Sequence, residues 1–156
     1  MSLDFSMALP NLKDVSSAVL RAAERGIGRA LLQLKTDMIT QRPTAPIKEG
    51  FLRGSTSIHV QDKELPVPLG PRENAFKKIM GYQIPLQPGK LIGLIGLNVP
   101  YAARTHEVPM VFRNWPGGTP STEVGNKYLE SKMANNKELY KKIVVNSIKE
   151  EEARAK

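Results

Sequence analysis

The stretch that most constrains the fold is Lys90–Glu107, the most apolar part of the chain. Turn-forming residues bound its apolar run, with Pro88-Gly89 before it and Asn98–Pro100 after it. The run itself consists of large aliphatic residues interrupted only by Gly93 and Gly96, and its members are Leu91, Ile92, Leu94, Ile95 and Leu97. A short apolar run between turns is typical of a buried strand. Its glycines indicate that another backbone or a bulky side chain comes close, or that the strand bends.

The residues around this strand predict the remaining elements. Tyr101–Glu107, small on one side and polar on the other, predicts a second strand that completes a hairpin. Leu52–Gln61, in which serines and a threonine lie between the apolar residues with an imperfect period, predicts a further strand, with Gly54 at a bulge or bend.

Two amphipathic helices are expected at the ends of the chain. The first begins at Asn11, a suitable N-cap, and stops near Gln41 because Pro43 follows. Gly26 and Gly28 weaken this helix but allow another element to cross it closely. The second helix runs from about residue 123 to residue 153, with a weak point at Asn135-Asn136.

Three further segments carry expectations of their own. Residues 1–10 predict a flexible N-terminal arm, and the charged residues 150–156 predict a frayed tail. Residues 62–89 form a long connection interrupted by prolines, an inserted arm that is too long for a simple loop. Its apolar residues either dock on a neighbouring subunit or fold back on their own domain; they are Leu65, Val67, Leu69, Phe76, Ile79, Met80, Tyr82, Ile84 and Leu86.

The order of these elements is helix, strand, long arm, strand, strand, helix. Because helices and strands do not alternate regularly, the expected fold class is α+β. The expected architecture is a small antiparallel sheet packed against a long N-terminal helix and a C-terminal helix. With 156 residues, the chain is expected to form a single domain.

Composition excludes several classes of function. The chain has no cysteine, so it has no disulfide, thiolate nucleophile or cysteine metal site. Its start lacks the pattern of a secretory signal and no apolar run is long enough to cross a bilayer, so we expect a soluble protein that stays in the cytosol and has no membrane partner. The formal net charge of +8 fits a nucleic-acid partner, an acidic protein surface or solubility alone.

The pair His106-Glu107 is the one place that suggests catalysis. A zincin helix would need a histidine at position 110, where the chain has Met110, and Pro109 opposes a helix there. His59 on the first strand could meet His106 and Glu107 across paired strands, which gives a metal-dependent hydrolase as one alternative. A polar sheet edge or a subunit contact is the other interpretation. The chain has no phosphate-binding loop and no nucleophile elbow, so we expect no enzyme, no catalytic residue and no cofactor.

Three short segments, taken together, resemble a known family. Pro46–Ser55 is similar to a P-x-x-x-G-x-L-R-x-S pattern that leads into the first strand. Ile95-Gly96-Leu97 followed by Val99–Ala102 and then by His106-Glu107 resembles a glycine strand, a Tyr-Ala pair and a His/Val-Glu pair. Lys127–Glu130 resembles the start of the family's last helix. In this order along the chain, the segments resemble those of the head–tail joining or tail-completion (minor tail component) family of long-tailed bacteriophages.

The resemblance implies a non-enzymatic virion subunit, assembled in the host cytoplasm, that forms a ring at the phage neck as a tail terminator or completion protein. It implies a homo-oligomeric ring, a hexamer by analogy with a dodecamer as the alternative. The implied partners are neighbouring neck proteins, the tail tube and, without sequence readout, the passing DNA. Tyr101, Arg104, His106 and Glu107 are expected to join the arm residues at the subunit interface. A small basic nucleic-acid-binding module is the alternative from another class.

Overall fold

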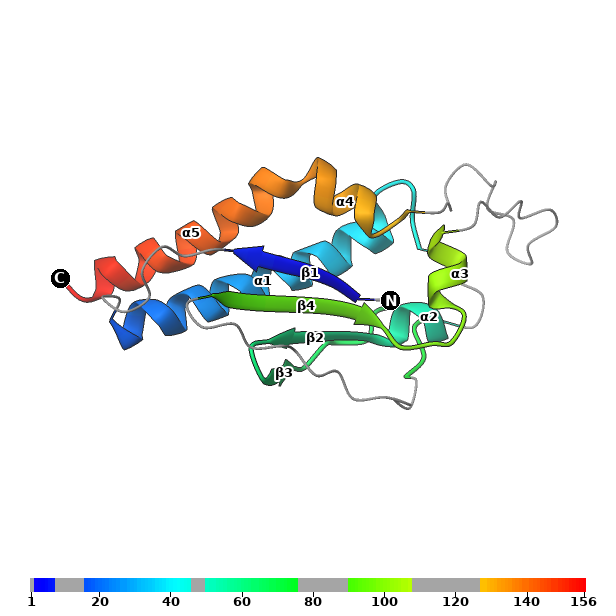
Figure 1. The fold of residues 1–156 in the computed structure, drawn as a ribbon, viewed down its shortest axis with the longest axis horizontal. Helices are drawn as coiled ribbons and strands as arrows, with labels where there is room; N and C mark the ends of the chain where they lie inside the picture. The colour runs from blue at the N-terminus through cyan, green and yellow to red at the C-terminus, as the bar shows by residue number, and fades with distance from the viewer. Residues whose placement is uncertain (1, 8–15, 46–49, 76–89, 108–126) are drawn as a thin grey trace.

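A computed structural model describes residues 2–7, 16–45, 50–75, 90–107 and 127–156. Its elements, in chain order, are β1 (Ser2–Met7), α1 (Ser17–Thr40), α2 (Phe51–Gly54), β2 (Thr56–Val60), β3 (Lys63–Leu65), β4 (Leu91–Leu97), α3 (Ala102–Glu107), α4 (Glu130–Asn135) and α5 (Lys137–Arg154) (Figure 1). The expected fold class is confirmed, because an antiparallel sheet packs with a long N-terminal helix and a C-terminal helix. None of the helices in the described ranges is long and apolar enough to span a membrane.

The predicted apolar strand is the centre of the sheet. The strand order is β1-β4-β2-β3, every pairing is antiparallel, and all seven residues of β4 are buried. Ile95 of β4 lies opposite Ile58 of β2, and both are fully buried. A strand of this kind, buried on both faces, needs no polar alternation, which explains its continuous apolar sequence.

Helix α1 packs against this sheet through a glycine. A Cβ atom at Gly93 would meet the side chain of Ile27 and lie 2.9 Å from Leu31 Cδ1. Gly93 therefore faces α1, and it allows the helix to come closer to β4 than any other residue would. The expectation that a glycine in this run marks a close approach is confirmed at this position.

Helices α1 and α5 run antiparallel and form the largest helix contact (Figure 1). Gly26 lies at their closest crossing, where a Cβ atom would be 2.9 Å from Val144 Cα and 3.1 Å from Ser147 Cβ. Helix α1 begins at the N-cap Ser16, whose hydroxyl accepts from the Val19 N–H, and it ends at Gln41 as predicted. The expected start at Asn11 falls outside the described residues.

The N-terminal segment differs from the flexible arm expected at residues 1–10. Ser2–Met7 is not a flexible arm; it forms β1 and pairs along β4 from Ser2 opposite Gly96 to Met7 opposite Leu91. Apolar and polar residues alternate over this segment of the sequence, which is the period of a strand.

The segment Tyr101–Glu107 is not the second strand of a hairpin, because Ala102–Glu107 forms the helix α3. Its first turn closes through a bond from the Thr105 N–H to the Tyr101 carbonyl, at 3.0 Å. Ala102 and His106 are buried while the residues between them are partly or fully exposed, which is the spacing of a helix and not of a strand. Alanine has the highest helix propensity, so Ala102 and Ala103 also favour a helix here.

The predicted strand Leu52–Gln61 begins later than expected, because Phe51–Gly54 forms the short helix α2. Gly50, with φ of 79°, turns the chain into that helix, and β2 follows from Thr56. Gln61, with φ of 55°, then reverses the chain so that β3 pairs with β2. The first three residues of the expected arm after Asp62 are therefore part of the sheet.

The described part of the arm folds back onto its own protomer. The Lys35 ammonium of α1 lies 2.8 Å from the Glu73 carboxylate and donates to the Pro68 carbonyl, also at 2.8 Å. The side chains of Lys35 and Glu73 are 7% and 1% exposed, and the Gly70 N–H donates to the same carboxylate. This buried ion pair fixes residues 68–73 against α1.

A second buried polar group joins the end of α1 to the C-terminal helices. The Tyr140 hydroxyl donates to the Asp37 carboxylate at 2.7 Å, and Asn136 Nδ2 donates to the same oxygen at 3.1 Å. Burial and then this bond to Asp37 raise the pKa of Tyr140 well above its usual value. Asn136 is also the residue at which α4 ends and α5 begins, so the predicted weak point is a real break in the helix.

The C-terminal residues differ from the frayed tail expected at residues 150–156. Helix α5 continues to Arg154, and the Glu151 carboxylate is 2.7 Å from the Arg25 guanidinium of α1. Residues 150–154 are therefore helical and held to α1, and they are not a frayed tail.

We expect Gly26→Ala to lower the free energy of unfolding by about 1–3 kcal/mol, because its methyl group would press on the backbone of α5. Gly28→Ala is the matched control. The nearest atom there is Leu65 Cδ1 at 2.6 Å, the end of a side chain that can turn away. Urea unfolding of the two variants tests this, and equal stability of both would contradict the close helix crossing.

We expect Glu73→Gln to destabilise the isolated protein by about 3–5 kcal/mol, because it leaves the buried Lys35 ammonium without its counter-charge. The double variant Lys35→Met/Glu73→Gln should recover most of this loss, and Glu152→Gln at an exposed position serves as the control. Urea unfolding at a concentration where the protein is monomeric provides the measurement. A Glu73→Gln variant as stable as the control would show that this segment is not held within its own protomer.

Candidate functional site

The candidate site is the junction of α3 with the start of α4, which we call the α3–α4 cluster. It consists of Thr105, His106, Glu107, Lys127, Tyr128 and Glu130. Backbone bonds hold the two segments together, and the Lys127 N–H donates to the His106 carbonyl at 2.7 Å. The cluster lies at one end of the molecule, around α3 (Figure 1).

His106 is buried, with 1% of its surface exposed, and both of its ring nitrogens have a partner. The Glu130 N–H, at the first position of α4, points at Nε2 from 3.4 Å. Nε2 is therefore the acceptor, which places the ring proton on Nδ1, 2.8 Å from the Glu107 carboxylate. Since α4 has no side-chain cap of its own, the imidazole satisfies one of the backbone donors at its start.

A chain of charges covers this histidine on the solvent side. The Lys127 ammonium is hydrogen-bonded to the Glu107 carboxylate and lies 2.9 Å from the Glu130 carboxylate. The bond from Lys127, followed by the bond from His106, lowers the pKa of Glu107 below its usual value. The same interactions, with Glu107 first, raise the pKa of Lys127. One ammonium thus serves two carboxylates, and all three groups are substantially exposed.

Tyr128 fills the space beneath His106. The two rings are edge to face, with centroids 4.9 Å apart and planes at 88°. The hydroxyl of Tyr128 lies 3.2 Å from that of Thr105, and burial raises the pKa of this phenol. Tyr128 is completely buried, so the cluster is anchored in the core through this ring.

Three of these residues could in principle hold a metal ion. One ligand atom from each of His106, Glu107 and Glu130 lies within 4.8 Å of the others, and His59 does not belong to this group. The hydrolase alternative from the sequence, with His59, His106 and Glu107 as ligands, therefore loses one of its ligands. In addition, a metal on Nδ1 of His106 would place the proton on Nε2, where it would point at the Glu130 N–H. The Lys127 ammonium already provides the positive charge between the carboxylates, so this arrangement fits a structural brace better than a metal centre.

The other residues expected at a subunit interface divide into exposed and covered ones. Tyr101, the residue directly before α3, is 46% exposed, and Arg104 of α3 is also exposed. Leu65 and Val67 are partly buried against their own core, while Leu69 is 51% exposed. The remaining arm residues of the hypothesis, Phe76, Ile79, Met80 and Tyr82, lie outside the described residues.

The structure brings together the sequence segments that carry the family resemblance. The N–H of Asn98, which lies between Leu97 and Val99 of the second segment, bonds to the Ser55 hydroxyl at 3.1 Å, so the described end of the first segment lies beside the second. The Tyr128 hydroxyl reaches the Ala102 carbonyl, and Lys127 reaches Glu107, which connects the second and third. Segments far apart in the sequence therefore form one continuous structural unit.

Comparison with known proteins gives no relative. No protein-family model, no curated protein and no solved structure matches this chain. The basis for a function is therefore the geometry above together with the resemblance of the short segments.

Sequence reasoning missed the role of Lys127 and Glu130 in the cluster. Both belong to the segment Lys127–Glu130, which the sequence identified only as the start of a helix. The signal that could have found them is the repeated pairing of opposite charges on two polar segments, Arg104–Glu107 and Lys127–Glu130. No local pattern, however, says that these two segments meet.

We expect Glu107→Gln to lower the melting temperature of the protein above about pH 6, because Lys127 and His106 lose a charged partner. A lowered pKa means that the stability from this carboxylate is present above its usual value of 4.5 and is lost as the pH falls through the lower folded value. The melting temperatures of wild type and variant should therefore converge only as the pH falls below that lowered folded pKa. Scanning calorimetry across this range measures the effect, and Glu152→Gln should track the wild type throughout. A difference that persists unchanged at low pH would contradict the ion pair.

Proposed function

We propose that this protein is a structural virion subunit of the neck of a long-tailed bacteriophage. Several copies form a ring that joins the head connector to the tail, in a tail-terminator or tail-completion role. A hexamer is the favoured state and a dodecamer the alternative, both by analogy with the family that the sequence resembles. The protein has no catalytic role in this proposal.

The observation that carries the proposal is the meeting of the resembling segments in one structural unit. Here Ser55, Ala102, His106 and Lys127 belong to segments joined by hydrogen bonds at one end of the molecule. These segments could therefore act together as one part of a subunit, which is what the proposed function requires of them.

The chemistry of the described residues is consistent with assembly. Every buried side-chain nitrogen and oxygen among them has a hydrogen-bond partner. A perturbed, unsatisfied group in a cleft is what a catalytic site usually presents, and the α3–α4 cluster instead satisfies its groups internally. Tyrosine and arginine are enriched among the residues that dominate subunit contacts, and Tyr101, directly before α3, and Arg104 of α3 are both exposed.

The net charge of +8 suits a ring through which DNA passes. Cations scattered over such a surface attract the phosphate backbone without reading its sequence. In this proposal DNA contact is non-specific and secondary to contacts between subunits.

The test is electron microscopy of the protein, alone and mixed with its neck partners, together with averaged images of necks of intact virions. We expect a closed ring with one copy of this protein per symmetry unit. Sedimentation velocity would show a discrete oligomer of the same mass. A protein that stays monomeric in every mixture contradicts the proposal, and salt-sensitive DNA binding by that monomer would favour the nucleic-acid-binding alternative.

A further inference from the structure

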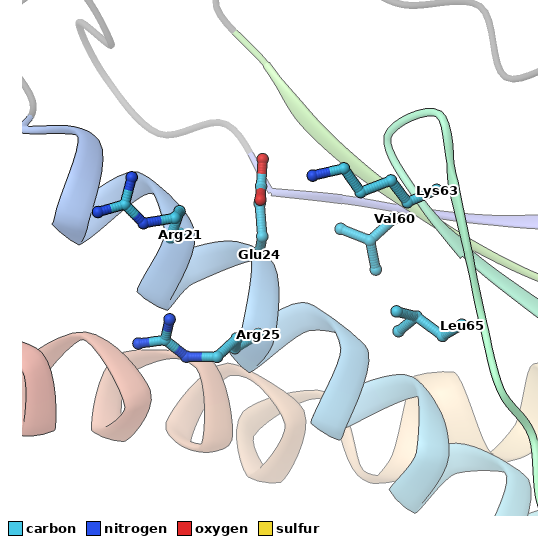
Figure 2. A pocket seen from close by; sticks show the side chains of 6 residues that line it. All are labelled: Arg21, Glu24, Arg25, Val60, Lys63 and Leu65. Carbon is cyan, nitrogen blue, oxygen red and sulfur yellow. The ribbon is translucent and has the colours of Figure 1, made fainter.

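A pocket lies between α1 and the β2–β3 hairpin, away from the α3–α4 cluster (Figure 2). Its volume is about 220 Å³, and its lining consists of Arg21, Glu24, Arg25, Val60, Lys63 and Leu65. Val60 and Leu65 form an apolar floor, and the charged residues surround it. Apolar cavities of about 150 Å³ hold a benzene molecule, so this pocket has room for one aromatic ring.

The rim of the pocket carries charges that are not neutralised by the described part of the protomer. Arg25 is paired with Glu151 of α5. Arg21, Glu24 and Lys63 form no ion pair with any other described residue. The rim therefore offers one carboxylate and a surplus of positive charge beside an apolar floor.

The outer surface of α3 offers the opposite combination. The ring of Tyr101 is 46% exposed, which leaves much of its apolar area in water. Arg104 is exposed and forms no ion pair within the described ranges. Beside it, Glu107 and Glu130 share the single ammonium of Lys127, so these three groups together carry one more negative charge than positive, which balances Arg104 over the surface as a whole.

From this complementarity we propose that the outer surface of α3 of one copy docks into the α1–hairpin pocket of the next copy. Tyr101 lies on the floor formed by Val60 and Leu65. Arg104 pairs with Glu24, and the surplus negative charge of Glu107 and Glu130 faces Arg21 and Lys63. In the apolar contact, an exposed ring covers an apolar floor. In the two charge contacts, groups that are not neutralised within their own protomer meet groups of opposite charge.

The placement of the two surfaces suits a ring. Helix α3 lies at one end of the molecule, and the pocket lies toward the other end, where α1 begins and the hairpin turns (Figure 1). A contact between two different surfaces of identical copies is heterologous, and it closes into a ring when the rotation between copies allows. This inference rests on the proposed function, since it identifies the contact by which the proposed ring is built.

Cysteine cross-linking tests the contact directly, because the natural chain contains no cysteine. We would prepare Glu24→Cys and Arg104→Cys separately, mix them and add a short bismaleimide. The mixture should give covalent dimers, while neither variant alone should, because each copy then carries a thiol at only one of the two surfaces. A mixture of Arg104→Cys with Lys142→Cys is the matched control, since Lys142 is exposed on α5 away from both surfaces.

A charge exchange provides the second measurement. Arg104→Glu and Glu24→Arg should each weaken self-association at least tenfold in sedimentation velocity, and the double variant should restore it to near the wild-type level. Circular dichroism would verify that all three variants fold. Restoration in the double variant distinguishes a direct pair from general damage to the surface.

The outcomes separate this inference from the proposed function. If rings form in micrographs but the Glu24–Arg104 mixture cross-links no better than the control, the docking contact is wrong and the neck function stands. Cross-linking of one variant with itself would show an isologous contact and would also overturn the inference. If no ring forms under any condition, both proposals fail together.

Discussion

The close approach of α1 to the buried strand β4 is the constraint on which the rest of the structure depends. Gly93 lets Ile27 and Leu31 press onto the centre of the strand, and Gly26 lets α5 press onto the other side of α1. One helix is thus packed between a sheet and a second helix, with a glycine at each contact. This dense packing stabilises the molecule. The missing side chain of each glycine lets the neighbouring elements approach, so that their larger side chains make close van der Waals contacts.

Buried polar groups then fix the connections that hydrophobic packing leaves free. The Lys35–Glu73 pair holds a proline-rich connection against α1, and Asp37 with Tyr140 and Asn136 holds the break between α4 and α5. At the far end, His106 ties α3 to the first turn of α4. Each of these links joins residues distant in the sequence. Their main effect is to fix the position of each connection. They add less to stability, because the attraction of the partner does little more than offset the desolvation free energy of a buried charge.

The same arrangement explains why the molecule suits assembly. Its internal links satisfy the buried polar groups of the described residues, so the chemistry left for partners is on the outer surface. The two surfaces with unneutralised charge and exposed apolar area, α3 and the α1–hairpin pocket, belong to different ends of the fold. A subunit of this form presents one surface to each of two neighbours.

Local pattern was sufficient for the longest and most periodic elements. The apolar run Leu91–Leu97, the end of α1 at Gln41, the break near Asn136 and the α+β class all follow from propensity, apolar spacing and turn residues. The local pattern gave the wrong element at Tyr101–Glu107, because a short polar segment fits either a strand or a short helix. The burial of Ala102 and His106, four residues apart, is what favours the helix. Over Ser2–Met7 the sequence does have the period of a strand, but only the pairing with β4 shows that this segment is part of the sheet.

The sequence by itself therefore determined the fold class, the central strand, most of the long helix α1 and the segments that suggest a family. Only the tertiary structure decided that His106 faces inward as a brace for α4, that Lys127 and Glu130 join Glu107, and that residues 68–73 return to their own protomer. The physical reason is the range of the interactions. Helix and strand periodicity act between near neighbours, whereas ion pairs and ring contacts between distant segments exist only after the chain has folded.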